Sequence, residues 1–151
     1  MLSSDWVTKK TVKPAKVAEA IGMAPATFYR RCNEGRFGSK FTIPGKGQVR
    51  PSFNFDDIFL VITFYWLTAY GRSEKDAQGT INLINQAERL FPGENWVIRV
   101  RSDHGVTSDS LMGGPNPEQE QVQVFGTILE IQVSKQQITQ AAENVVSKYG
   151  E

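Results

Sequence analysis

Apolar residues recur at helical spacing near the start of the chain. Val17, Ala18 and Ile21 follow Pro14, which suits the first turn of a helix because the N–H that proline lacks has no partner there. Gly22 is typical of a helix end, since glycine adopts positive φ at no steric cost. The pattern predicts a short helix between Pro14 and Gly22.

A second helix is predicted to begin at Pro25, within about three residues of the end of the first. Two helices joined so closely cross at a steep angle, and Met23 and Phe28 can fill the crossing. Five side chains then lie on or beside the outward face: Ala26, Thr27, Tyr29, Arg30 and Arg31. This arrangement is typical of a helix-turn-helix, whose second helix enters the major groove of DNA.

A short β-hairpin is predicted between Phe41 and Val49, where apolar residues flank a glycine-rich turn. Taken alone, this basic loop is a solvated turn, but after a helix-turn-helix it is typical of a wing. Lys40, Lys46 and Arg50 would then lie along the sugar-phosphate backbone and fix the register of the protein on DNA.

A long apolar helix is predicted next. Residues 58–70 are apolar around most of the helix circumference, so one small domain cannot cover every side. A central core helix is favoured over a helix in a subunit interface. Another helix extends through Leu90. Three pairs have the spacing of helix N-caps: Asn54 with Asp57, Ser73 with Asp76, and Ser134 with Gln137.

After the Pro92-Gly93 pair, the period of the apolar positions changes to that of strands. Residues 96–101 and 121–133 alternate and predict two strands. They can pair antiparallel across a polar loop over 102–120, which we expect to be mobile or functional. A last helix carries one apolar stripe: Ile138, Ala141, Ala142, Val145 and Val146.

These elements define an α+β chain, mainly α. A winged helix-turn-helix over 1–55 is followed by a helical hairpin over 56–92, and residues 93–151 add a two-stranded antiparallel sheet and a C-terminal helix. A segment of about 59 residues is marginal alone, so it docks on the helical hairpin or pairs with a second copy. For a homodimer we expect contacts from six apolar residues: Phe125, Ile128, Leu129, Ile131, Ile138 and Val145.

Charge is divided unevenly along the chain. Residues 1–55 contain ten Lys or Arg and three acids, whereas residues 56–151 contain seven bases and thirteen acids. A basic front end indicates a polyanionic partner, because clustered Lys and Arg displace condensed counterions from phosphates. The predicted contacts with double-stranded DNA are Lys13, Lys16, Ala26, Thr27, Tyr29, Arg30, Arg31, Lys40, Lys46, Gln48 and Arg50.

Several motifs occur together in residues 12–91: residues 17–22, the Thr27-Phe28-Tyr29 triplet, Gly35, the basic hairpin and residues 53–58. This set resembles the DNA-binding domain of MerR-type regulators, whose wing is followed by a helical hairpin. The resemblance implies that Thr27, Tyr29 and Arg30 face DNA, with Lys46 and Arg50 as wing contacts. The long dimerisation helix of that family is absent, and residues 93–151 form an unfamiliar α+β segment.

Other kinds of site lack the residues they need. One histidine and one cysteine cannot form a structural zinc site unaided, and metal sensing requires several thiolates. His104 has serines nearby but no strand-turn-helix context that would place a nucleophile. We expect no enzyme activity, no metal and no cofactor; a small-molecule effector stays unknown. Cys32 is expected to be an inert small hydrophobe.

The longest apolar run, within residues 58–67, is about half of the ~20 residues that a bilayer crossing needs, so we expect no membrane partner. We expect a cytoplasmic protein that joins the nucleoid through DNA. The expected function is sequence-specific DNA binding by a dimer, as in a bacterial or phage transcriptional regulator. Two alternatives stay open: an architectural factor for phage excision, recombination or DNA packaging, and a protein-interaction module that does not bind DNA.

Overall fold

A computed structural model describes residues 9–37, 41–43, 48–49, 51–69, 73–103, 106–113, 123–125 and 128–151. This part of the chain is α+β and mostly helical. Its helices are α2 (Pro14–Ala20), α3 (Pro25–Asn33), α4 (Phe55–Ala69), α5 (Glu74–Leu90) and α6 (Lys135–Tyr149). Its strands are β1 (Thr42–Ile43), β2 (Gln48–Val49), β3 (Trp96–Asp103), β4 (Val106–Gly113), β5 (Gln123–Phe125) and β6 (Ile128–Ser134).

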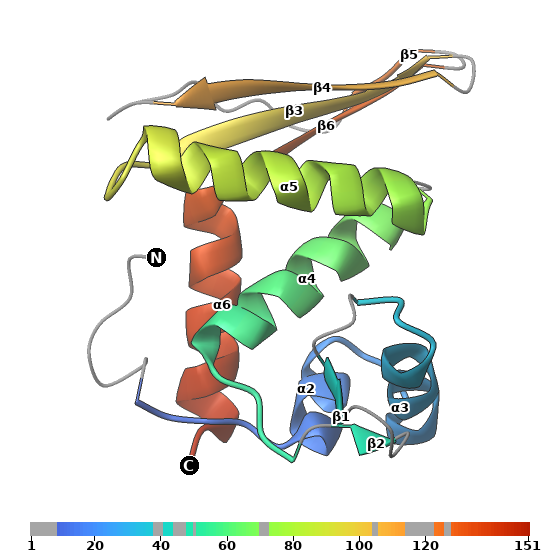
Figure 1. The fold of residues 1–151 in the computed structure, drawn as a ribbon, viewed down its shortest axis with the longest axis vertical. Helices are drawn as coiled ribbons and strands as arrows, with labels where there is room; N and C mark the ends of the chain where they lie inside the picture. The colour runs from blue at the N-terminus through green and yellow to red at the C-terminus, as the bar shows by residue number, and fades with distance from the viewer. Residues whose placement is uncertain are drawn as a thin grey trace.

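The elements form layers along the long axis of the molecule (Figure 1). A four-stranded antiparallel sheet in the order β4-β3-β6-β5 lies at one end. Helix α5 runs along one face of this sheet, and α4 and α6 lie beyond it (Figure 1). The opposite end of the molecule holds α2, α3 and the small β1-β2 sheet.

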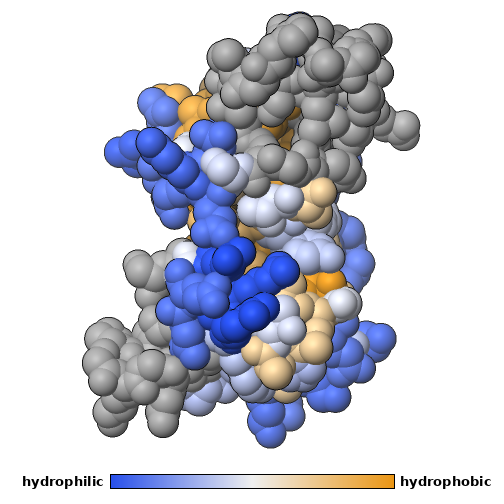
Figure 2. All heavy atoms as spheres, turned by 90° about the vertical axis from the view of Figure 1, so that its right-hand side faces the viewer, coloured by the Kyte–Doolittle hydropathy of each residue, from blue (hydrophilic) through white to orange (hydrophobic). Residues whose placement is uncertain are grey.

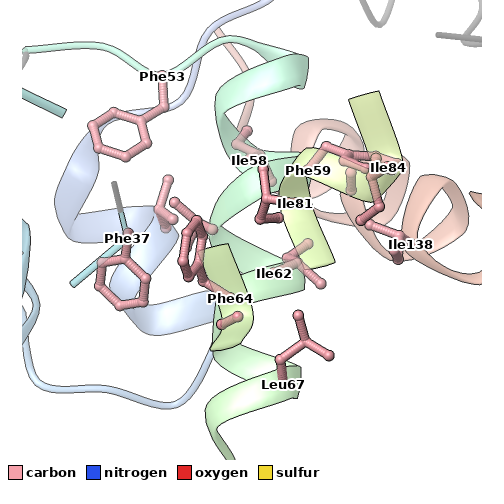
Figure 3. Packing of buried hydrophobic residues seen from close by; sticks show 14 of the residues in the cluster. Phe37, Phe53, Ile58, Phe59, Ile62, Phe64, Leu67, Ile81, Ile84 and Ile138 are labelled. Carbon is pink, nitrogen blue, oxygen red and sulfur yellow. The ribbon is translucent and has the colours of Figure 1, made fainter. Parts of the chain in front are cut away.

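Helix α4 is the centre of the hydrophobic core, as its apolar sequence predicts. Nine of its fifteen residues are buried. Around it, Figure 3 shows Phe37 and Phe53 on one side and Ile81, Ile84 and Ile138 from α5 and α6 on the other. The buried Thr63 causes no penalty, because its hydroxyl donates to the Phe59 carbonyl at 2.8 Å. The buried residues of all three predicted segments therefore belong to one cluster.

The three predicted N-caps are present. Asn54 and Asp57 form a reciprocal pair, in which each backbone N–H donates to the side chain of the other at 3.0 and 2.9 Å. The Ser73 hydroxyl accepts from the Asp76 N–H at 3.1 Å, and the Ser134 hydroxyl accepts from the Gln137 N–H at 3.1 Å. These caps set the first turns of α4, α5 and α6, and α4 begins three residues before the predicted range.

The predicted pairing of the two C-terminal strands is confirmed, but the predicted two-stranded sheet is wrong. Strands β3 and β6 pair antiparallel with Ile98 opposite Val133. The predicted loop over 102–120 contains strand β4, and the predicted strand over 121–133 is the β5-β6 hairpin. Strand β4 was not predicted, because a strand is recognised by apolar residues at its inward positions and Asp109 occupies one of them. There the Thr80 hydroxyl of α5 donates to one of the two Asp109 carboxylate oxygens, at 2.6 Å.

The C-terminal segment docks on the helical hairpin. Ile138, Ala142 and Val146 of α6 are buried in the core cluster, which includes most of α4. At the junction of α5, β3 and α6, the Glu88 carboxylate accepts from the Trp96 indole and from the Lys135 ammonium, each at 3.1 Å. The Lys135 side chain is only 3% exposed, so this ion pair carries a nearly buried charge.

Glu88→Gln is expected to destabilise the fold by about 1–3 kcal/mol, because it leaves the Lys135 ammonium without its counter-charge in the interior. The measurement is urea unfolding followed by circular dichroism. Glu94→Gln, which changes an exposed carboxylate nearby, is the matched control and should leave the midpoint unchanged. Equal midpoints for the two variants would show that the buried pair contributes nothing to stability.

Candidate nucleic-acid interface

A tight turn fixes the angle between α2 and α3. Gly22 has a φ of 74°, and the Met23 N–H donates back to the Ala18 carbonyl at 2.9 Å, which closes the end of α2. Pro25 then occupies the first turn of α3. Ala18 is fully buried, and its small side chain lets the two helices approach closely.

Aromatic residues hold the inner face of α3. Phe28 and Cys32 are fully buried on this face. The Phe28 ring lies 5.4 Å from the Phe37 ring and 5.9 Å from the Phe53 ring, between centroids. Phe53 is in turn fixed by a backbone bridge to Val12, with hydrogen bonds of 2.8 and 2.9 Å. The orientation of α3 is therefore set by rigid packing.

The opposite face of α3 is free of the core. Ala26, Tyr29 and Arg30 are exposed, whereas Thr27 and Arg31 are half-buried. Ala24, before the first turn, provides no side-chain cap, as the sequence indicates. The Tyr29 side chain, 36% exposed, is one of two large hydrophobic residues that stand out from the described surface. The five residues predicted for the outward face thus lie on one side of a helix held firmly from behind.

The predicted hairpin is present in the backbone that follows α3. β1 and β2 pair antiparallel, with Thr42 opposite Val49 and Ile43 opposite Gln48. Strand β2 contacts α3, so the hairpin lies beside the helix. Of the predicted wing residues, only the backbone of Gln48 is described; Lys40, Lys46 and Arg50 lie outside the described residues.

Between residues 13 and 36 the cations form two groups. Lys13 and Lys16 lie toward the end of α6: the Lys13 ammonium is 4.0 Å from Glu151, and the Lys16 ammonium is 5.7 Å from the centroid of the Tyr149 ring. Figure 1 shows α2 between α6 and α3, so these lysines lie apart from the arginines of α3. The structure therefore does not bring all the predicted phosphate contacts to one patch.

The second group is Arg30, Arg31 and Arg36, at and beyond the end of α3. Figure 2, which looks onto this side of the molecule, shows very hydrophilic side chains gathered in the middle of the face. Arg30 lies 4.0 Å from Glu34, and Arg36 lies 2.8 Å from Glu34 and 3.2 Å from Glu74. These acids are exposed, and such pairs contribute only about 0–1 kcal/mol, so phosphates can displace them.

A polar cleft of about 490 Å³ opens beside this group. Arg31 and Arg36 line one wall, and Tyr65, Thr68 and Glu74 from the end of α4 and the start of α5 line the other. The hydroxyl of Thr68 donates to the Phe64 carbonyl at 2.8 Å. No local pattern in the sequence indicates this cleft, because its walls lie about thirty residues apart in the chain.

The residues predicted for a dimer interface have different placements. Ile138 is fully buried in the protomer's own core, and Val145 packs half-buried against that core. Ile138 is therefore not available to a second copy, because the predicted apolar stripe of α6 covers α4. Phe125, Ile128, Leu129 and Ile131 lie in β5 and β6, and their side chains are outside the described set.

The described ranges hold neither a candidate metal site nor a candidate membrane span. There, no group of three or more His, Cys, Asp or Glu side chains converges on a point where a metal ion could be held. No helix among those residues has both the length and the apolar character needed to cross a membrane. His104, a weak catalytic candidate, lies outside the described residues.

Comparison with protein-family models, with curated proteins and with solved structures finds no match for this chain. A function must therefore be inferred from the chain's own residues. The features that bear on it are the angle between α2 and α3, the exposed face of α3, the adjoining hairpin and the distribution of charge.

Burial raises the pKa of the Cys32 thiol from 9.0 to about 12, because the thiolate would lose its hydration. At pH 8 only about one molecule in ten thousand then carries a thiolate. We expect the native protein to resist labelling by a disulfide reagent at pH 8, and one thiol per chain to react in denaturant. Rapid labelling of the native protein would contradict the packing of α3.

Proposed function

We propose that this chain binds double-stranded DNA as a winged helix-turn-helix protein. Helix α3 enters the major groove, and the β1-β2 hairpin lies along the adjacent backbone. The proposal rests on the difference between the two faces of α3. Phe28 and Cys32 are buried on one face, while Tyr29 and Arg30 are exposed on the other. A rigid helix with an exposed polar face fits a groove about 12 Å wide.

The exposed side chains suit the two tasks of such a helix. The Arg30 guanidinium can donate two hydrogen bonds to O6 and N7 of guanine, and Thr27 can contact a base edge beside it. Tyr29 and Arg31 contact phosphates or the groove wall, which positions the helix without reading sequence. The resemblance to MerR-type regulators supports the same residues, Thr27, Tyr29 and Arg30.

Charge supports a nucleic acid as the partner. Residues 9–37 carry seven Lys or Arg and two acids. The acids that neighbour Arg30 and Lys16 are exposed and are screened by salt, so they do not hold the cations in place. We propose the role of a transcriptional regulator, which should protect a discrete site near a promoter in footprinting. Protection and bending of recombination or packaging sequences would instead favour the architectural role.

The first test is the affinity for a duplex selected from a random DNA library by the protein itself. Arg30→Ala is expected to weaken binding by about 1–3 kcal/mol and to relax the preference for one guanine. Arg101→Ala removes an exposed arginine of β3, in the sheet at the opposite end of the molecule from α3, and is the matched control, with unchanged affinity. If no duplex is enriched, the proposal fails; equal losses on selected and random DNA would remove Arg30 from base recognition.

The second test is the salt dependence of affinity for the same duplex. Lys46→Ala is expected to reduce the slope of log affinity against log salt by about 0.9, because one phosphate contact is lost, with little change in sequence preference. Lys16→Ala removes a lysine beside Tyr149 and should leave the slope unchanged if DNA touches only α3 and the hairpin. A reduced slope for Lys16→Ala alone would place the DNA on the α6 side of α2.

A further inference from the structure

The outer edge of β4 has no strand beside it among the described residues. β4 stands at one end of the order β4-β3-β6-β5 and pairs with β3 over all eight of its residues, without a bulge. The opposite edge strand, β5, has only three residues. An open edge of eight residues presents a row of backbone groups that can pair with another chain.

Most of the usual protections of an edge strand are missing from β4. Residues 106–113 contain no proline and no lysine, and their single charge is Asp109. The Asp109 carboxylate points inward, where one of its oxygens accepts from Thr80, and an inward charge is one of these protections. Within residues 108–113, whose side chains the structure describes, the exposed ones are Ser108 and Ser110, which are small and uncharged. This edge therefore lacks the lysine, the proline and the bulge that commonly block the addition of a strand.

We propose that β4 pairs antiparallel with β4 of a second copy of this chain, forming a continuous eight-stranded sheet. A two-fold axis through Ser110 pairs seven residues, 107–113, and places Asp109 opposite Leu111 of the second copy. A centre at Asp109 would instead bring two carboxylates together, and like charges directly opposite are unfavourable. The axis stands perpendicular to the sheet, as it must for two identical antiparallel edges.

This symmetry makes the second copy the fitting occupant, and in this respect the inference rests on the proposed function. A two-fold axis perpendicular to the sheet keeps the helices of both copies on one face of it. In each copy, α3 and the hairpin lie at the end of the molecule away from the sheet (Figure 1). Both DNA-binding units then point to the same side and can address two halves of one symmetric site.

Helix α5 supplies further contact area beside the strand. It runs along β4 from the Thr80-Asp109 hydrogen bond to Phe91, whose ring occupies the space that a Cβ at Gly113 would need. Seven residue pairs between two β4 strands alone bury less than the ~800 Å² per partner of a standard interface. A neighbouring surface must therefore take part. Helix α5 exposes four uncharged amide side chains that can contribute to such a surface: Gln78, Asn82, Asn85 and Gln86.

Two other residues of α5, Gly79 and Leu90, have no role within one copy that accounts for them, and contact with a second copy would give them one. Gly79 lies in mid-helix, where a Cβ would meet nothing within 4 Å, so the protomer itself does not require glycine there. A glycine allows the backbones of two antiparallel α5 helices to approach closely. Leu90 is 59% exposed at the end of α5, and it is the large exposed hydrophobic residue that the DNA surface does not use.

The test is the mass of the full chain by sedimentation equilibrium. We expect a dimer of twice the 16.9 kDa chain mass. Ser110→Lys places two ammonium groups opposite each other at the axis and is expected to give a monomer with an unchanged circular dichroism spectrum. Gln137→Lys adds the same charge on the exposed surface of α6 and should leave the dimer intact.

A monomeric wild type, or a folded Ser110→Lys variant that stays dimeric, would overturn the inference. If Ser110→Lys does not fold, Leu90→Lys decides, because this exposed residue can be changed without disturbing β4; an unaltered dimer then overturns the proposal. Binding of the selected duplex is measured in parallel. A dimer that ignores DNA would refute the proposed function alone, whereas a monomer that binds DNA would refute only the dimer.

Discussion

The structure depends on the need to cover α4 on every side. This helix is apolar around most of its circumference, and nine of its residues are buried. No single neighbour can cover such a surface. α5 and α6 cover part of it, and Phe37 and Phe53 lie against another part (Figure 3). Three stretches of sequence therefore share one core, and the short C-terminal segment gains from it the burial that it could not achieve alone.

The same core positions the candidate DNA-binding face. Phe53 lies just before α4 and packs against Phe28 of α3, while Phe55 and Phe59 continue the aromatic contacts toward Trp96 under the sheet. These two groups of rings belong to one core cluster, which extends from α3 to β3 of the sheet. Because packed aromatic residues resist displacement, α3 and the sheet keep a fixed relation. That rigidity is what a dimer needs if its two recognition helices are to match two half-sites.

Local signals predicted most of the helices, because their causes are local. Pro14, Gly22 and Pro25 act within one turn, and the caps at Asn54, Ser73 and Ser134 bind backbone groups three residues away. Strand β4 could not be predicted in this way. Its inward Asp109 accepts from Thr80, 29 residues earlier, and the Phe91 ring occupies the space that a Cβ at Gly113 would need. The candidate site divides similarly: the faces of α3 follow from spacing, whereas the position of Lys16 beside Tyr149 depends on the docking of α6.

The strand that the sequence pattern conceals is also the one that gives the molecule an open edge. An edge strand must keep its inner face acceptable to its own core, and Asp109 with its Thr80 partner satisfies that condition. Its outer edge can then pair with a strand of a second copy. Exposed serines and the absence of lysine and proline lower the cost of adding a strand, and the two-fold axis that results leaves the helices on one side. In the proposed arrangement the sheet would join two copies, α4 would give each copy a rigid body, and α3 with the hairpin would face the DNA.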